Sequence, residues 1–254
     1  MRLRAVFVLV LSIVPAAARA QAAGTPIATD RPGFLFSSLT AGRGVVQAEL
    51  GLPAVTLQEK GDVRTTSLVG LLRVGLGDDF ELRLGGPFLN ETRVEAGGRT
   101  TRERGYGDLE IGFKWHAVDN DGGRPSFALI PSVILPVGKK GFSAGDPVWQ
   151  LNTATEWTLD DGWATGLLAG FLRGDGVLQQ TYGALLGRTV GPWSPYLEAV
   201  YVATDREDSD DSSFLGGGLK VLLSDDVQID LNFDRGLTDE SPDWLFGFGL
   251  GVRF

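Results

Sequence analysis

The last eleven residues, "WLFGFGLGVRF" from Trp244 to Phe254, decide the fold. Every second position from Trp244 to Phe254 carries a large apolar side chain, whereas the positions between them are mostly glycine, with Arg253 near the end. Successive side chains of a β-strand point to opposite faces, so this period of two predicts a strand with one apolar face. Such a face packs in the core of a soluble sandwich or contacts lipid on the outside of a membrane barrel.

Earlier segments repeat the alternation. The stretches "GDLEIGFKWH" (107–116) and "VQIDLNFDRG" (227–236) alternate apolar side chains with mostly polar or charged ones. About twelve such segments of roughly ten residues occur, which is the length that crosses a bilayer at a tilt. One strand alone fits either a sandwich or a barrel, so the connections between strands must separate the two.

The connections alternate between short and long. Tight turns are expected at residues 77–79, 160–162, 191–193 and 224–226, with a longer one at 117–124. The other connections are mostly longer and more polar: 58–64, 87–106, 138–146, 174–178, 204–212 and 236–243. This rhythm predicts an all-β fold, a single transmembrane antiparallel β-barrel of about 12 strands with short periplasmic turns and longer outer loops.

The N-terminus predicts export. Residues 1–20 have a basic start, a short apolar core and small residues at Ala18 and Ala20, as in a secretory signal peptide. We therefore expect a signal peptide at 1–20, a periplasmic lead or inner segment at 21–44, and an outer-membrane β-barrel at 45–254. The expected location is the bacterial outer membrane.

The composition limits the chemistry. The chain has no Cys, a single His and a net charge of −9, which argue against disulfides, a His-based zinc site and nucleic acid as a main partner. We expect no cofactor. His116 shares a strand face with charged residues and lacks a recognisable nucleophile motif, so a structural or rim position is favoured over catalysis. The acidic loop 204–212 does not have the spacing of an EF-hand and is read as solvated.

Aromatic residues mark the predicted membrane interfaces. We expect an aromatic girdle, at the periplasmic end from Trp115, Trp157, Trp163 and Trp193, and at the outer end from Trp149 and Trp244. Phe254, at the end of an alternating last strand, resembles the signal that such barrels present to their assembly machinery. The expected partners are therefore outer-membrane lipid, the barrel assembly machinery and an unidentified small-molecule solute.

Charged residues opposite the apolar faces are expected to line the lumen. They are Glu49, Arg73, Glu81, Arg83, Asp108, Glu110, Lys114, Glu156, Arg188, Glu198, Lys220, Asp230, Asp234 and Arg253. Mixed signs are consistent with pairing across neighbouring strands and with a pore lining, and both readings stay open. The glycines at 216, 218, 247, 249 and 251 occupy little volume, which favours some open space.

Several motifs occur together in a familiar order: "ATDRPGF" (28–34), "QAELG" (47–51), "FELRLG" (80–85), "GDLEIGFKW" (107–115) and "ILPVG" (134–138). This set resembles the outer-membrane "transporter" family labelled putative MetA-pathway of phenol degradation, although Val137 stands where Thr is expected. The resemblance implies a barrel and the passage of small, perhaps aromatic, molecules. It implies no catalytic or binding residues.

Three functions remain after these arguments. The first is a channel or transporter for passive uptake or efflux of small molecules, hydrophobic or aromatic ones among them. The alternatives are a structural or adhesive barrel without transport and, ranked lowest, a membrane lipid hydrolase acting through His116. We expect no enzyme activity.

Overall fold

The computed structural model describes residues 25–58, 62–121, 123–205 and 211–254, so the expected signal peptide and residues 206–210 of the acidic loop lie outside the described residues. Among the residues described, no helix is long and apolar enough to cross a membrane. The strands are β1 (Val46–Gln58), β2 (Val63–Gly75), β3 (Phe80–Ala96), β4 (Arg99–Gly105), β5 (Leu109–Val118), β6 (Ser126–Leu135), β7 (Val148–Thr158), β8 (Trp163–Gly174), β9 (Val177–Arg188), β10 (Trp193–Asp205), β11 (Ser212–Ser224), β12 (Val227–Gly236) and β13 (Trp244–Arg253).

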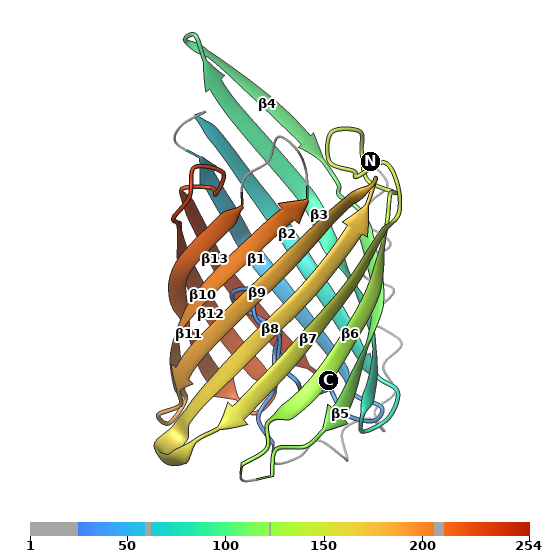
Figure 1. Ribbon diagram of the computed structural model, residues 1–254, viewed down its shortest axis with the longest axis vertical. Helices are drawn as coiled ribbons and strands as arrows, with labels where there is room; N and C mark the ends of the chain where they lie inside the picture. Colours follow the sequence, from blue (N-terminus) through green and yellow to red (C-terminus); the bar gives the residue numbers. More distant parts are fainter. Residues whose placement is uncertain (1–24, 59–61, 122, 206–210) are drawn as a thin grey trace.

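Twelve of these strands form a closed antiparallel barrel, which confirms the predicted fold (Figure 1). Each strand pairs with its neighbour in sequence, except that β3 pairs with β5 over residues 80–85 and with β4 over residues 90–96. The last strand closes the barrel, because β13 pairs with both β12 and β1, with Leu250 opposite Leu50. Full closure leaves no exposed sheet edge within the barrel, which a membrane requires.

The connections are mostly short turns at one end of the barrel and mostly longer loops at the other, as predicted. Two of the connections differ from the prediction. Residues 87–106, expected as a loop, instead extend β3 and form a hairpin with β4 that projects beyond the barrel (Figure 1). Gly97 and Gly98 both have positive φ, which suits a two-residue hairpin turn. The connection expected at 174–178 is also a two-residue turn, Asp175–Gly176, with positive φ at both positions. In 87–106, side chains that are mostly polar on both faces conceal the strands, whereas at 174–178 the two glycines suggest a longer turn than the structure has.

The barrel is apolar outside and charged inside. On β7, Trp149 points outward and is 67% exposed, whereas Arg73 on the inner face of β2 is fully buried. This is the reverse of a soluble protein and is the pattern of a strand that faces lipid on one side and a lumen on the other. The same alternation in β13 places its glycines inside and Phe246 and Phe248 outside, both substantially exposed.

Residues 25–45, here called the inner segment, run inside the barrel (Figure 1, in blue). They contain no regular strand or helix. Nevertheless Ile27, Thr29, Asp30 and Ser38 are buried, because the barrel wall surrounds them. The segment occupies the end of the lumen near the short turns, since the Ile27 N–H donates to the Asp225 carbonyl of the β11–β12 turn at 2.7 Å.

Candidate functional site: the inner segment and the lumen

Asp30 is the main ionic contact between the inner segment and the barrel. Its carboxylate accepts a hydrogen bond from Arg83 Nη1 at 2.5 Å and two from Lys114 Nζ at 2.7 and 3.0 Å. Its own backbone N–H donates to Glu49 at 3.0 Å. Asp30 is 8% exposed, so these bonds form largely away from water, where charge-assisted hydrogen bonds are strong.

Arg73 connects the wall charges to one another and to the segment. Its guanidinium donates two bonds to Glu81, at 2.8 and 2.9 Å, and one to Glu49 at 3.0 Å. Two further bonds reach the segment, at the carbonyls of Ala28 (2.6 Å) and Leu39 (2.7 Å). The fully buried guanidinium therefore finds acceptors for its N–H groups, which a buried charge requires. We call the set Glu49, Arg73, Glu81, Arg83 and Lys114, on β1, β2, β3 and β5, the charged wall.

The charged wall sets the ionisation of Asp30. Burial raises the pKa of this carboxyl, but the charges of Arg73, Lys114 and Arg83 outweigh burial and hold the pKa well below its usual range. Asp30 is therefore ionised at neutral pH when the segment is docked. Removing its charge would leave two buried cations, on Arg83 and Lys114, without their main anionic partner on the segment.

Ser38 forms a second, smaller anchor. Its hydroxyl and its N–H both donate to Glu156, at 2.5 and 2.6 Å, and its carbonyl lies 2.9 Å from Nδ1 of His116. The other ring nitrogen of His116 lies 2.9 Å from Asp119. In this arrangement His116 contacts the backbone of the segment and a turn carboxylate.

The opposite side of the barrel holds the segment mainly through apolar packing. Leu35 packs against Leu168, Val200 and Phe214, which lie on β8, β10 and β11 and which we call the apolar wall. Phe34 packs against Phe214, with ring centroids 5.2 Å apart. Phe36 packs against another patch, formed by Ala128, Ile130 and Ala154.

Two polar contacts accompany the apolar wall. Glu198 of β10 accepts a hydrogen bond from the Phe34 N–H at 3.0 Å, and Asp230 of β12 pairs with Arg31 at 3.2 Å. Gly33 has φ +83°, and a Cβ at this position would lie 2.3 Å from Glu198 Oε1. Only glycine therefore suits both the left-handed backbone and the close approach of the carboxylate.

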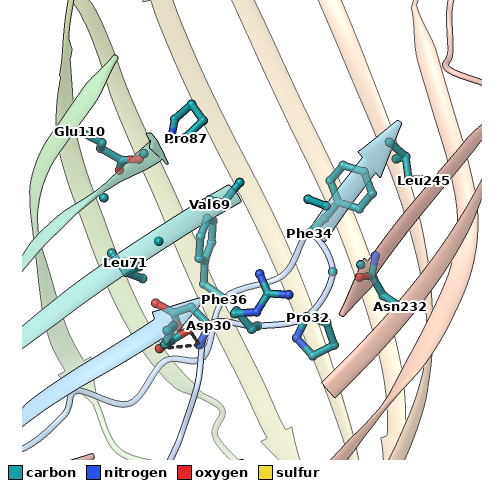
Figure 2. A pocket seen from close by; sticks show the side chains of 18 of the residues that line it. Asp30, Pro32, Phe34, Phe36, Val69, Leu71, Pro87, Glu110, Asn232 and Leu245 are labelled. Carbon is teal, nitrogen blue, oxygen red and sulfur yellow. Dashed lines mark hydrogen bonds between the residues drawn. The ribbon is translucent and has the colours of Figure 1, made fainter. Parts of the chain in front are cut away.

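Above the segment the lumen holds a cavity of about 480 Å³. Its lining combines side chains of the segment (Pro32, Phe34, Phe36) with wall residues such as Leu71 and Leu245 (Figure 2). Polar and charged groups also line the cavity: Asp30, Arg31, Glu49, Thr56, Arg83, Glu110, Gln150, Asn152, Asn232 and Asp234. The volume falls within the range of about 300–1,000 Å³ typical of small-molecule sites, which combine apolar side chains with placed polar groups.

The glycines of the lumen wall were predicted to favour open space, but the structure shows that other groups lie close to them. A Cβ on Gly249 would lie 2.2 Å from Arg31 Nε, and one on Gly251 would lie 2.6 Å from a methyl group of Thr29. These two glycines of β13 therefore accommodate the inner segment. Gly247 lines the cavity, and a Cβ there would lie 2.1 Å from the side-chain oxygen of Asn232.

Thirteen of the fourteen charged residues predicted to line the lumen fall into three groups. The buried ones on the inner face are Glu49, Arg73, Glu81, Arg83, Lys114, Glu198, Asp230, Asp234 and Arg253. Glu110 and Glu156 are partly buried and share that face with buried neighbours two or four residues away. Lys220 is also partly buried and lies opposite the buried Asp230 in the β11–β12 ladder. Asp108 precedes β5 and accepts bonds at 2.8 Å from the N–H groups of Gly138 and Ala144, so it holds an outer loop instead.

Arg188 is on the other face, which corrects its predicted place in the lumen. It lies opposite Trp163 in the β8–β9 ladder and shares the outward face of β9 with the exposed Tyr182 and Leu186. Its guanidinium lies 5.4 Å from the ring centroid of Trp163 and donates to the Asp161 carbonyl at 3.3 Å. A long basic side chain at a strand end can face outward, because it reaches the polar interface while its stem stays on apolar surface.

All six tryptophans lie on outward faces near strand ends. Trp115, Trp157, Trp163 and Trp193 lie toward the short turns, and Trp149 and Trp244 toward the other end. Trp115 stacks on Phe80 at 6.1 Å, and Arg235 lies 4.2 Å from the Trp244 ring. Phe254 follows β13 and donates its N–H to the Val46 carbonyl at 2.8 Å. Whether these residues act as a girdle and an assembly signal stays a prediction.

Sequence reasoning did not single out the segment residues that complete the site, chiefly Asp30, Arg31, Phe34, Leu35 and Ser38. The motif "ATDRPGF" could have indicated them, because it places the charged Asp30 and Arg31 directly before Pro32 and Gly33. Within the described residues no group of three or more His, Cys, Asp or Glu side chains is arranged to hold a metal ion.

Comparison with solved structures supports the same fold. An outer membrane channel from Pseudomonas putida F1 matches with a TM-score of 0.64 and 17% identity, over 88% of this chain and 99% of that one. The β domain of the Bordetella autotransporter BrkA matches with a TM-score of 0.57 and 12% identity, over 83% and 98% of the two chains. A KdgM porin solved with oligogalacturonate matches with a TM-score of 0.52 and 9% identity, over 83% and 99%.

The sequence comparisons give one family. Among curated protein sequences, none matches this chain significantly. The model of one protein family matches residues 29–254, which is nearly the whole described chain. The chain therefore belongs to the family described as putative MetA-pathway of phenol degradation.

Proposed function

We propose that the protein is an outer-membrane channel for the passive passage of small molecules, exported by its signal peptide, and that the inner segment controls its opening. The observation that carries the proposal is the division of the lumen into two parts. The inner segment fills the part near the short turns, and a cavity of about 480 Å³ remains beyond it. No disulfide ties the segment to the barrel wall, because the chain contains no cysteine. Its contacts with the lumen are therefore noncovalent and can open.

The barrel size supports a conducting role. Eight strands leave an interior just filled by side chains, and sixteen or more leave a water channel, so twelve strands provide room that an inner segment can close or open. The fold shared with outer-membrane channels and porins supports the same role and location.

The cavity lining favours solutes with an apolar body and a small polar group. Phe34 and Phe36 lie on the segment side, and Val69 and Leu71 lie on the wall (Figure 2). Asn152, Gln150 and Asn232 supply donors and acceptors that orient such a solute. The family description, which mentions phenol, supports an aromatic solute.

Planar-bilayer recording tests the proposal. The wild-type barrel is expected to show small or intermittent currents, and a variant that lacks residues 25–38 is expected to show larger and steadier ones. Liposome swelling with phenol and with a sugar then compares the solutes, and we expect faster entry of phenol. A barrel that stays sealed to ions and solutes with and without the segment would contradict the proposal.

A further inference from the structure

Three arginines form a row across the hairpin that projects from the outer end of the barrel. In the paired registers Arg64 of β2 lies opposite Arg93 of β3, and Arg93 lies opposite Arg102 of β4. Directly opposite residues of an antiparallel ladder lie on the same face of the sheet, with Cβ atoms about 4.5–5.5 Å apart. The three side chains therefore start from neighbouring positions on one face.

This face is the outward one. Val69 and Leu71 of β2 line the lumen cavity, so the even-numbered residues of β2, Arg64 among them, point away from the lumen. Along that outward face the row Leu68–Leu89 comes first, then Thr66–Glu91, and then Arg64–Arg93. Leu89 is exposed, as a lipid-facing residue is.

The spacing places the arginines just beyond the apolar band. Alternate residues of a strand lie about 6.8 Å apart, so the arginine row starts roughly 14 Å along the strand from the Leu68–Leu89 row. Strands of such barrels tilt by about 35–45°, which makes the height difference roughly 10 Å. At that height above the Leu68–Leu89 row, the arginine side chains reach the headgroup layer of the outer leaflet.

The row is unfavourable without an anionic partner. Like charges placed directly opposite on a sheet destabilise the pairing. Arg93 has an ion pair with Glu95, but Arg64 and Arg102 have none within the described part of the chain. Arg104, two residues beyond Arg102 on the same face, pairs with Glu91. This face thus carries four arginines and two glutamates, in a chain whose net charge is −9.

We propose that Arg64, Arg93 and Arg102 bind the phosphate groups of an anionic glycolipid of the outer leaflet. The planar guanidinium donates two parallel hydrogen bonds to a phosphate, and two phosphates on one sugar headgroup can span neighbouring arginines. The bound lipid neutralises the repulsion in the row. It also fixes the projecting hairpin at the membrane surface, beside the entrance to the lumen.

Lipid binding by purified protein tests this inference. Wild type, the triple variant Arg64→Gln/Arg93→Gln/Arg102→Gln, and the control Arg99→Gln are titrated in neutral detergent with lipid A carrying two phosphates, and bound lipid is counted by native mass spectrometry. Arg99 is an exposed arginine of β4 at an odd-numbered position, so it lies on the opposite face from Arg102. Heat-modifiable gel mobility confirms that all three barrels are folded.

The triple variant is expected to bind lipid A on the order of a hundredfold more weakly, since each of the three basic residues near an anionic surface contributes roughly a factor of five. Arg99→Gln is expected to bind like wild type, and monophosphorylated lipid A is expected to bind wild type less tightly. Equal lipid A binding by wild type and the triple variant would overturn the inference. So would equal losses in the control, or inorganic pyrophosphate binding as tightly as lipid A, which would make the lipid unnecessary.

Discussion

The two sides of the barrel hold the same inner segment by different means. The charged wall makes at least three charge-assisted contacts to Asp30, whereas the apolar wall packs around Leu35. Glu198 and Asp230, on the same side as the apolar wall, each add one polar contact. Breaking a buried ion pair by removing one partner costs about 3–5 kcal/mol, because the other charge stays buried. Apolar contacts are lost in smaller steps. We therefore expect the charged wall to control docking in a nearly all-or-none manner and the apolar wall to adjust it in smaller steps.

The largest effect is expected from Asp30→Asn. This change removes the partner of Arg83 and Lys114 while keeping the side-chain shape, so the segment should leave the lumen and the wall charges should hydrate. We expect planar-bilayer conductance to rise toward that of the variant lacking residues 25–38.

A double variant sharpens the assignment of that effect. Lys114→Met alone removes one buried cation, and combined with Asp30→Asn it removes both partners of one pair. Removing both partners leaves fewer uncompensated charges than removing one, so the double variant should conduct less than Asp30→Asn alone. If the conductance increase of the double variant over wild type equals the sum of the increases of the two single variants, the two residues act independently.

Leu35→Ala is expected to give an intermediate effect. Truncating a buried leucine costs about 2–5 kcal/mol, with the smaller values where neighbours can relax into the space, as the partly buried Phe34 and Leu185 can here. We expect more frequent openings in single-channel records, but a closed state that still predominates. Conductance above that of Asp30→Asn would reverse the proposed order of the two walls.

Gly33→Ala isolates one contact on the apolar side. Gly33 and Gly44 both have positive φ, at +83° and +72°, but a Cβ would meet Glu198 only at Gly33, and nothing lies within 4 Å at Gly44. Both alanines carry the strain of a left-handed backbone, on the order of 1–2 kcal/mol. The difference between the two variants in open probability therefore measures the Glu198 contact, and identical behaviour would show that this contact contributes nothing.

The smallest effect on the inner segment is expected from Phe254→Ser, which lies on neither wall. Phe254 is 39% exposed, so its ring contributes less than the roughly 1.5–3 kcal/mol of a fully buried one. If it belongs to the assembly signal, the amount of protein in the outer-membrane fraction should fall severalfold, with conductance and detergent resistance of the assembled barrel nearly unchanged. Normal membrane levels with weaker detergent resistance would identify it as a packing residue only.

The barrel can be predicted from the pattern of apolar and polar residues alone. The unbroken alternation from Trp244 to Phe254 predicted which side of β13 faces outward, because a strand has a fixed period of two and each face meets only one environment. The same rule worked wherever one face was apolar. It failed for 87–106, where most side chains on both faces are polar, and for Arg188, because a strand end can extend a basic side chain outward.

What fills the lumen could not be predicted from the sequence and is seen only in the closed barrel. The inner segment has no periodicity to read, and its position depends on partners far away in sequence, such as Lys114 for Asp30 and Asp230 for Arg31. Those partners come together only when the strands have closed into a ring. Local patterns determine how each strand faces its surroundings, but a segment without secondary structure of its own is placed by the charges and the space that the closed barrel presents to it.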